Sequence, residues 1–289
     1  MSTATIERVG VVGGGLMGSG IAEVCARAGL DVIVREVDDD AVAAARGRID
    51  NSLSRAVRSG KLTEEAREDA TAHIRLTTDL GDLADRQLVV EAVVEAEDEK
   101  LAVFSALDKV VRESDAILAS NTSSIPIMKL AMATSRPASV LGLHFFNPVP
   151  VLHLVELIPS LLTGDDTAER ARAFASDTLG KIVIRSQDRA GFIVNALLIP
   201  YILSAIRMLE SGFASAEDID AGMVEGCAHP MGPLALGDLI GLDTTMAVAE
   251  SLYEEFKEPL YAPPPLLSRM VEAGLLGRKT GRGFYEYRR

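Results

Sequence analysis

A glycine-rich turn near the start of the chain constrains the fold more than any other feature. The segment VGVVGGGLMGSGIAEV places Gly13, Gly15 and Gly18 in the spacing G-x-G-x-x-G, after an apolar run typical of a buried strand and before a run with helical periodicity. Gly13 permits a tight turn, Gly15 allows a ligand to approach the backbone, and Gly18 lets the helix pack closely on the strand. The N-terminus of that helix offers free N–H groups and partial positive charge to phosphates. The segment therefore predicts a strand-turn-helix unit that binds a dinucleotide.

An acidic residue ends the next strand-like run. Glu36 closes the segment DVIVRE, downstream of Gly18 by the interval expected in such units. A carboxylate at this point accepts hydrogen bonds from the adenosine ribose hydroxyls and repels a 2′-phosphate, which predicts NAD as the cofactor. The neighbouring Arg35 leaves a preference for NADP open, because an arginine accommodates that phosphate.

Strand-like and helical runs alternate through the first part of the chain. Short apolar runs typical of buried strands span residues 8–13, 31–36, 73–76, 87–93, 115–120 and 139–145. Helical runs span residues 16–29, 38–60 and 97–111. This alternation predicts an α/β fold, in which a Rossmann-like dinucleotide-binding domain has a parallel sheet covered by helices on both faces.

The C-terminal third has a different pattern. Helical runs span residues 191–212, 215–226, 233–256 and 263–274, with almost no strand signal between them. A chain of 289 residues is also of the size that usually forms two domains. We expect an NAD-binding domain over residues 1–187 and an all-helical domain over residues 188–289.

The composition excludes several classes of protein. A formal net charge of -13 argues against a nucleic acid or an anionic membrane as partner, so an anionic substrate requires a local basic patch. The two cysteines, Cys25 and Cys227, show neither metal-ligand spacing nor a disulfide framework, and we expect no metal. The sequence shows no secretory signal and no apolar run long enough to span a membrane, so we expect a cytoplasmic protein.

The segment HFFNPVPVLHLVE begins with His144 and ends with Glu156. Pro148 and Pro150 disfavour a helix and favour an extended path. In an extended chain the two polar residues are too far apart to touch, and they meet only if the turn-forming NPVP reverses the chain. The residues alone leave a second interpretation open, in which His144 belongs to the core and Glu156 to a sheet edge.

Ordered motifs along nearly the whole chain resemble a known family. GGGLMGSGIA, VVEAVVE, ASNTSS, GLHFFNPVP, LVEL, GFIVNALLIPY, HPMGPLAL, GLDTT and KTGRGFY occur in the order and near the spacing of the L-3-hydroxyacyl-CoA dehydrogenases, most closely the single-function 3-hydroxybutyryl-CoA dehydrogenases. The resemblance implies a dinucleotide-binding domain followed by a helical domain that binds substrate and forms a homodimer.

The resemblance also implies roles for matching residues. His144 would be the general base, Glu156 would hold and polarise it, and Ser123 and Asn195 would hydrogen-bond the oxygen on C3 or the thioester carbonyl. Cofactor contacts are implied for Gly13, Gly15, Leu16, Met17, Gly18, Glu36, Glu95, Lys100, Asn147 and Lys279. Coenzyme A contacts are implied for Ser52 and for the basic residues Arg55, Arg58 and Lys61.

The implied activity is the reversible NAD-dependent oxidation of an L-3-hydroxyacyl-CoA thioester, with a short substrate such as 3-hydroxybutyryl-CoA favoured, in fatty-acid or butanoate metabolism. Three alternatives stay open. They are a gulonate-type dehydrogenase of a free hydroxy acid, an acetoacetyl-CoA reductase that prefers NADPH, and a nucleotide-sensing protein that no longer turns over substrate.

Overall fold

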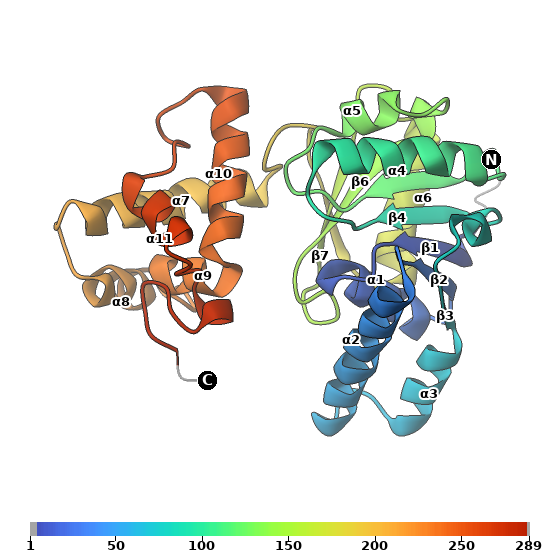
Figure 1. Ribbon diagram of the computed structural model, residues 1–289, viewed down its shortest axis with the longest axis horizontal. Coiled ribbons are helices and arrows are strands. Elements are labelled where there is room, and N and C mark those ends of the chain that lie inside the picture. The colour runs from blue at the N-terminus through green and yellow to red at the C-terminus, as the bar shows by residue number, and fades with distance from the viewer. Residues whose placement is uncertain (1–4, 288–289) are drawn as a thin grey trace. The chain divides into compact units, whose positions relative to one another are not determined.

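The structure is a computed structural model that describes residues 5–287. The chain divides into two compact units, of which the first ends at Arg189 and the second begins at Ala190 (Figure 1). Within the described residues, no helix is both long and apolar enough to cross a membrane.

The first unit is built on a single sheet. Over the described residues this sheet has eight strands in the order β3-β2-β1-β4-β5-β6-β7-β8. The strands are β1 (Arg8–Val12), β2 (Asp31–Arg35), β3 (Ile74–Thr77), β4 (Leu88–Glu91), β5 (Ile117–Ser120), β6 (Val140–Phe145), β7 (Leu154–Pro159) and β8 (Ile182–Arg185). The predicted α/β fold is confirmed, although the sequence patterns did not predict β7 and β8.

The sheet departs from the prediction at one pairing. All neighbouring strands are parallel except β6 and β7, which are antiparallel. The expectation of an entirely parallel sheet is wrong here because residues 146–153 form a turning connection, whereas a parallel pair needs a longer crossover. The antiparallel pair has a direct consequence for the candidate site, since it places residues of β6 opposite residues of β7.

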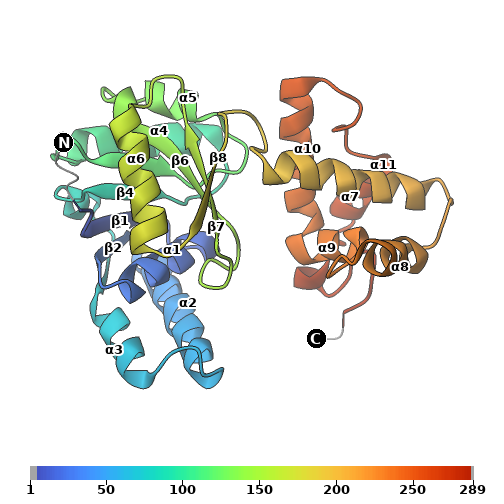
Figure 2. The ribbon, with the colours of Figure 1, turned by 180° about the vertical axis from the view of Figure 1, so that it is seen from behind.

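Helices cover both faces of the sheet. They are α1 (Leu16–Arg27), α2 (Asp39–Arg58), α3 (Glu64–Ala72), α4 (Glu97–Val110), α5 (Ile127–Met132) and α6 (Asp165–Ala173). Helices α4 and α5 lie over the near face in Figure 1, and α6 crosses the other face in Figure 2. Val9 and Val11 of β1 join a core cluster with Ile21 of α1 and Ala171 of α6. Since successive strand residues point to opposite faces, Val9 and Val11 share one face while the buried Val12 lies on the other, and β1 is apolar on both sides.

The order of the strands changes direction within the sheet. From β1 the chain builds outward through β2 and β3, and then returns to place β4 on the other side of β1. Strand order therefore reverses between β1 and β4. In open α/β sheets, ligands bind at the carboxyl ends of the strands beside such a reversal.

A buried lysine stabilises the connection between β6 and β7. Lys181 Nζ donates to the carbonyl oxygens of Val149 (2.6 Å) and Leu152 (2.7 Å). Its ammonium satisfies backbone acceptors that a turning loop leaves without ladder partners. The same loop packs on α1, because a Cβ placed on Gly20 would lie 2.9 Å from the Cβ of Val149.

The second unit is helical. It contains α7 (Val194–Glu210), α8 (Ala216–Cys227), α9 (Pro233–Ile240), α10 (Leu242–Phe256) and α11 (Pro265–Glu272). Their apolar faces form a separate core around Leu203, Leu234 and Leu252. The run 233–256, expected as one helical stretch, is two helices because Gly241 adopts φ +105°, outside the right-handed helical region.

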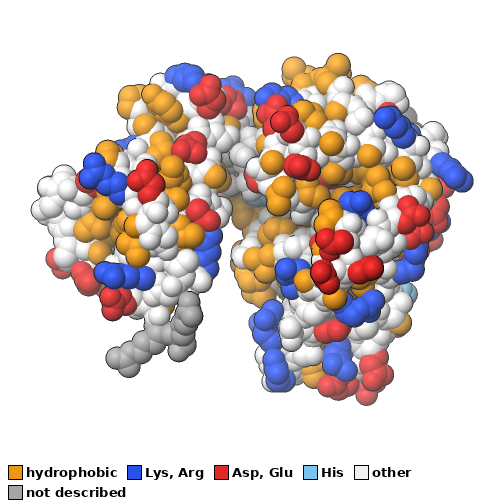
Figure 3. Space-filling view, in the orientation of Figure 1, with side chains coloured by type: hydrophobic (Ala, Val, Ile, Leu, Met, Phe, Trp, Pro, Cys, Tyr) orange, Lys and Arg blue, Asp and Glu red, His pale blue; other side chains and the backbone are white. Residues whose placement is uncertain are grey.

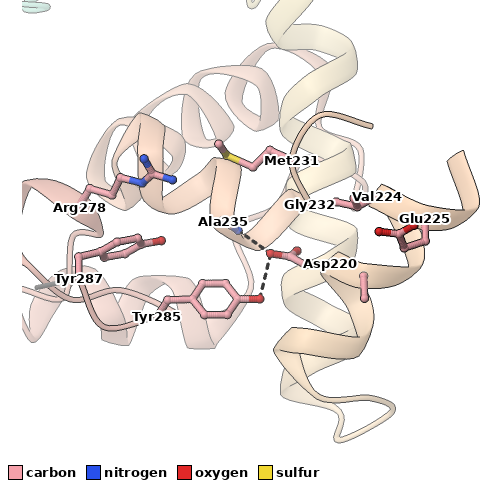
Figure 4. Close-up of a pocket in the computed structure, with 10 residues that line it drawn as sticks. Asp220, Val224, Glu225, Met231, Gly232, Ala235, Arg278, Tyr285 and Tyr287 are labelled. Carbon is pink, nitrogen blue, oxygen red and sulfur yellow. Dashed lines mark hydrogen bonds between the residues drawn. The ribbon is translucent and has the colours of Figure 1, made fainter. Parts of the chain in front are cut away.

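Two buried carboxylates anchor the last segment of this unit. Asp220 accepts hydrogen bonds from the amides of Leu234 (2.8 Å) and Ala235 (2.9 Å) and from Tyr285 Oη (2.9 Å), part of which Figure 4 shows. Asp238 accepts one from Tyr287 Oη (3.0 Å). Asp220, Tyr285 and Tyr287 line a cavity of about 480 Å³, and both tyrosine hydroxyls are engaged in hydrogen bonds. The arrangement indicates a structural role.

Replacing Tyr285 with phenylalanine is expected to lower the free energy of unfolding by about 1–3 kcal/mol, because buried Asp220 loses a donor. Burial is the largest cause, and the hydrogen bond to Asp220 the next, that raises the pKa of Tyr285 above the ordinary value of 10.0. A tyrosine with a raised folded-state pKa loses its stabilising contribution as the pH rises, so the difference between variant and parent should shrink above pH 10. Denaturant unfolding at several pH values measures both effects, with Tyr253→Phe as the matched control. An equal stability of Tyr285→Phe and the parent at neutral pH would contradict the anchoring role.

Candidate active site

The glycine turn has the geometry of a phosphate-binding loop. Gly13 follows β1 with φ +92°, and Gly15 precedes α1 without a side-chain cap on the helix N-terminus. A Cβ at Gly18 would lie 1.7 Å from the carbonyl oxygen of Gly13, so this position requires glycine. A Cβ at Gly15 would meet no atom within 4 Å. The backbone above Gly15 is therefore open to a ligand, and the N–H groups of α1 are available to phosphate oxygens.

Glu36 lies beside this turn. Its Oε1 accepts a hydrogen bond from the amide of Gly14 at 2.6 Å, which fixes the carboxylate at the carboxyl ends of β1 and β2. The neighbouring Val37 is an exposed apolar residue, suited to the face of an adenine ring. Arg35 donates its Nε to the carbonyl oxygen of Thr78 (3.3 Å). These residues therefore fit the adenosine half of NAD, with the Glu36 carboxylate as the acceptor for the ribose hydroxyls.

The antiparallel register brings the histidine and the glutamate together. His144 of β6 pairs directly with Glu156 of β7, and directly paired residues project from the same face of a sheet. His144 Nδ1 lies 2.7 Å from Glu156 Oε2, and both side chains are buried. The NPVP turn thus achieves the reversal that the contact requires.

The hydrogen bonds of the histidine ring define its chemistry. When the Glu156 carboxylate accepts from Nδ1, the neutral ring carries its proton on that atom and leaves Nε2 as an acceptor. Nε2 lies 3.0 Å from Oγ of Ser123, which comes from the loop after β5. A hydroxyl placed near Ser123 could give its proton to Nε2, and Glu156 would stabilise the imidazolium that forms.

In the structure Glu95 contacts Ser123, and Lys100 contacts Glu95. Glu95 follows β4, and its Oε1 accepts a hydrogen bond from the amide of Ser123 (2.9 Å). Burial raises the pKa of Glu95, but Lys100 and hydrogen bonds from the 122–124 loop outweigh it and hold that pKa below its usual range. Lys100 is almost completely buried and contacts Glu91 (2.6 Å). Glu91 was not among the predicted site residues, although an acidic residue that ends an apolar strand is a signal of this kind.

A cavity of about 250 Å³ lies among α1, α2 and the loop after β6. Its lining includes the predicted residues Leu16, Ser52, Arg55 and Asn147, together with Arg48 and Glu23, which the sequence interpretation missed. Arg48 lies one helical turn before Ser52 on α2, so helical spacing from Ser52 would have found it. Arg58 and Lys61 do not line this cavity; both are exposed, Arg58 as the last residue of α2 and Lys61 in the turn after it. Figure 3 shows Lys and Arg side chains over this end of the first unit, with acidic side chains among them.

Glu23 introduces a buried acid into the cavity. Its Oε2 has no hydrogen-bond partner among the described residues. Burial raises the pKa of Glu23, against the lowering effects of Ser52, Arg27 and Arg55. The cavity therefore combines basic groups on α2 with one buried acid whose pKa is raised.

Asn195 and Lys279 belong to the second unit. Asn195 lies in the first turn of α7, and Lys279 Nζ contacts both carboxylate oxygens of Asp243 at 2.5 Å. Their roles toward substrate and cofactor remain predictions. Within residues 5–287 there is no group of three or more His, Cys, Asp or Glu side chains that could hold a metal ion.

Comparison with protein-family models identifies both units. Residues 8–189 match the model described as "3-hydroxyacyl-CoA dehydrogenase, NAD binding domain", and residues 191–287 match "3-hydroxyacyl-CoA dehydrogenase, C-terminal domain". The matches account for nearly the whole chain.

Individual proteins and structures agree with these models. The chain is 62% identical to a 3-hydroxybutyryl-CoA dehydrogenase of Mycobacterium tuberculosis over 98% of this chain and 99% of that protein. It is 42% identical to the human mitochondrial hydroxyacyl-coenzyme A dehydrogenase over 98% of this chain and 92% of that protein. The crystal structure of (S)-3-hydroxybutyryl-CoA dehydrogenase from Ralstonia eutropha superposes with a TM-score of 0.93 at 48% identity, covering 99% of this chain and all of that one.

Proposed function

The chain belongs to the 3-hydroxyacyl-CoA dehydrogenase family, and from this premise we propose that it oxidises L-3-hydroxybutyryl-CoA to acetoacetyl-CoA with NAD and catalyses the reverse reduction. It is an NAD-dependent dehydrogenase of 3-hydroxyacyl-CoA thioesters. The preference for the short acyl chain is the proposed part, and it is supported by the names of relatives at 62% and 47% identity. The observation that carries the chemistry is the hydrogen-bonded series Ser123–His144–Glu156, in which His144 and Glu156 are buried.

We propose that His144 is the general base of the oxidation. Bound NAD would supply the acceptor for the hydride that leaves C3 of the substrate. Nε2 of His144 takes the proton of the C3 hydroxyl as the C–H bond at C3 breaks. The products are the ketone, NADH and one proton held on His144. Glu156 keeps the other ring nitrogen protonated and stabilises the imidazolium. Ser123 Oγ lies 3.0 Å from Nε2 and orients the oxygen on C3 beside this nitrogen.

Substrate contacts are proposed on a combination of motif and geometry. Ser52 and Arg55 line the cavity on α2, where a guanidinium would meet the phosphates of coenzyme A despite the acidic chain. Asn195 is proposed to hold the C3 oxygen or the thioester carbonyl on the motif GFIVN alone. Arg58 and Lys61 are proposed as weaker, solvent-exposed contributors to phosphate binding.

The assembly and cellular setting are proposals as well. We propose a homodimer through the second unit, supported by exposed apolar side chains on one side of α7, Leu197 at 72% and Met208 at 40% exposure. We propose a cytoplasmic enzyme of fatty-acid or butanoate metabolism, which follows from the sequence expectation and the reaction class. A single species at the monomer mass in sedimentation would contradict the dimer.

Initial rates test the substrate and the cofactor together. The wild-type enzyme should oxidise NADH rapidly with acetoacetyl-CoA, much more slowly with 3-oxoacyl-CoA of long chain, and not measurably with free acetoacetate. Faster turnover with NADPH than with NADH would refute the role proposed for Glu36. Turnover of the free acid but not the thioester would favour the gulonate-type alternative.

A further inference from the structure

A fully buried lysine contacts two carboxylates next to the loop that carries Ser123. Lys100 Nζ lies 2.6 Å from Glu91 Oε1 and 3.2 Å from Glu95 Oε2. Glu91 has no exposed surface and Lys100 is 1% exposed. Burying such charges has a large desolvation cost, and apolar side chains of the same volume often stabilise a protein equally well. Stability alone is therefore a weak reason for three charged groups at this place.

Glu91 fixes the start of the loop that carries Ser123. Glu91 and Ser120 are register partners at the carboxyl ends of β4 and β5. Glu91 Oε2 accepts a hydrogen bond from Ser120 Oγ at 2.6 Å, and Ser120 Oγ accepts one from the amide of Thr122 at 3.2 Å. The first residues after β5 are thereby tied to the buried charge pair.

Glu95 fixes the rest of the loop. Its Oε1 accepts from Thr122 Oγ1 (2.5 Å), from the amide of Ser123 (2.9 Å) and from Ser124 Oγ (3.0 Å). One carboxylate oxygen thus gathers donors from three consecutive residues. Because Lys100 holds the other oxygen of Glu95, the position of the Ser123 backbone depends on the same ammonium group that binds Glu91.

We propose that Glu91, Lys100 and Glu95 form a positioning group that sets the distance between Ser123 Oγ and His144 Nε2. The inference rests on the proposed function, because it requires Ser123 to act on the substrate oxygen. Glu91 is thereby assigned a role in positioning Ser123. Lys100, for which the family resemblance implies a cofactor contact, is assigned to the support of Ser123 instead. The group acts on the reaction only through Ser123.

A double-mutant cycle between Thr122 and Ser123 tests this dependence. Thr122→Val removes the hydroxyl that donates to Glu95 while keeping the branched shape, and it leaves all three charges in place. In the wild-type background it should lower kcat for acetoacetyl-CoA reduction about 10-fold and change the dissociation constant of NADH less than twofold. In the Ser123→Ala background the same change should lower kcat less than twofold. Thr71→Val, which removes an exposed hydroxyl in α3, is the matched control and should have no effect in either background.

The outcomes separate the explanations. An equal loss of kcat from Thr122→Val in both backgrounds would overturn the inference, as would no loss in the wild-type background. Weakened NADH binding with unchanged kcat would assign the group to the cofactor instead. Lys100→Met and Lys100→Arg extend the test if they fold, with partial recovery of kcat expected for arginine. Failure of the wild-type enzyme to reduce acetoacetyl-CoA would refute the proposed function itself, a result distinct from any of these ratios.

Discussion

Replacing His144 with glutamine is expected to lower kcat by about 10²–10⁴-fold, the usual contribution of a positioned general acid or base. Glutamine keeps a polar side chain of similar length, but it does not take up a proton at neutral pH. Binding of NADH should change little, because His144 is not among the residues predicted to contact the nucleotide. Steady-state rates with acetoacetyl-CoA and a fluorescence titration with NADH measure the two quantities.

The partner residue gives the matched comparison for this prediction. Glu156→Gln should also lower kcat strongly, because an amide at 2.7 Å from Nδ1 does not fix the tautomer as a carboxylate does. His73→Gln, at the end of α3, should retain wild-type rates. Retention of more than a tenth of the wild-type kcat by His144→Gln would rule out the histidine as the base.

Replacing Gly18 with alanine is expected to abolish measurable NADH binding and to destabilise the first unit by several kcal/mol. The added methyl group would lie 1.7 Å from the carbonyl oxygen of Gly13, a contact that only movement of the backbone relieves. Such movement separates α1 from β1 and displaces the N–H groups that face the phosphates. Thermal unfolding and NADH titration measure the two losses.

Gly15→Ala separates cofactor binding from stability. Its methyl group meets no protein atom within 4 Å, so the melting temperature should stay near the wild-type value while NADH binding weakens. Gly47→Ala, within α2 and also free of contacts, should bind NADH normally and gain up to about 1 kcal/mol from helix propensity. Normal NADH binding by both Gly15→Ala and Gly18→Ala would show that the turn does not hold the cofactor.

The glycine turn and the alternating elements were predictable because their signals are local. Gly13, Gly15 and Gly18 each satisfy a requirement that a few neighbouring residues impose, and the α/β class follows from hydrophobic periodicity. The comparisons confirm the family resemblance, NAD as cofactor and the dehydrogenase activity.

The features that the sequence patterns missed depend on distant parts of the chain. Strand β8 pairs with β7 through contacts that no local pattern encodes. The contact between His144 and Glu156 was expected from the NPVP turn and the family resemblance, but the register of the antiparallel pair that makes it was not. The buried Glu91–Lys100 pair needs both the end of β4 and the first turn of α4. The break at Gly241 was missed because apolar helical spacing continues on both sides of it, although glycine there adopts a positive φ.

Transfer of deuterium tests the central claim most directly. NADH that carries deuterium on the transferred position of the nicotinamide is incubated with acetoacetyl-CoA and the enzyme, and the product is analysed by mass spectrometry and NMR. The account predicts L-3-hydroxybutyryl-CoA with a single deuterium at C3. NADH consumed without deuterium at C3, or a product of D configuration, would contradict it.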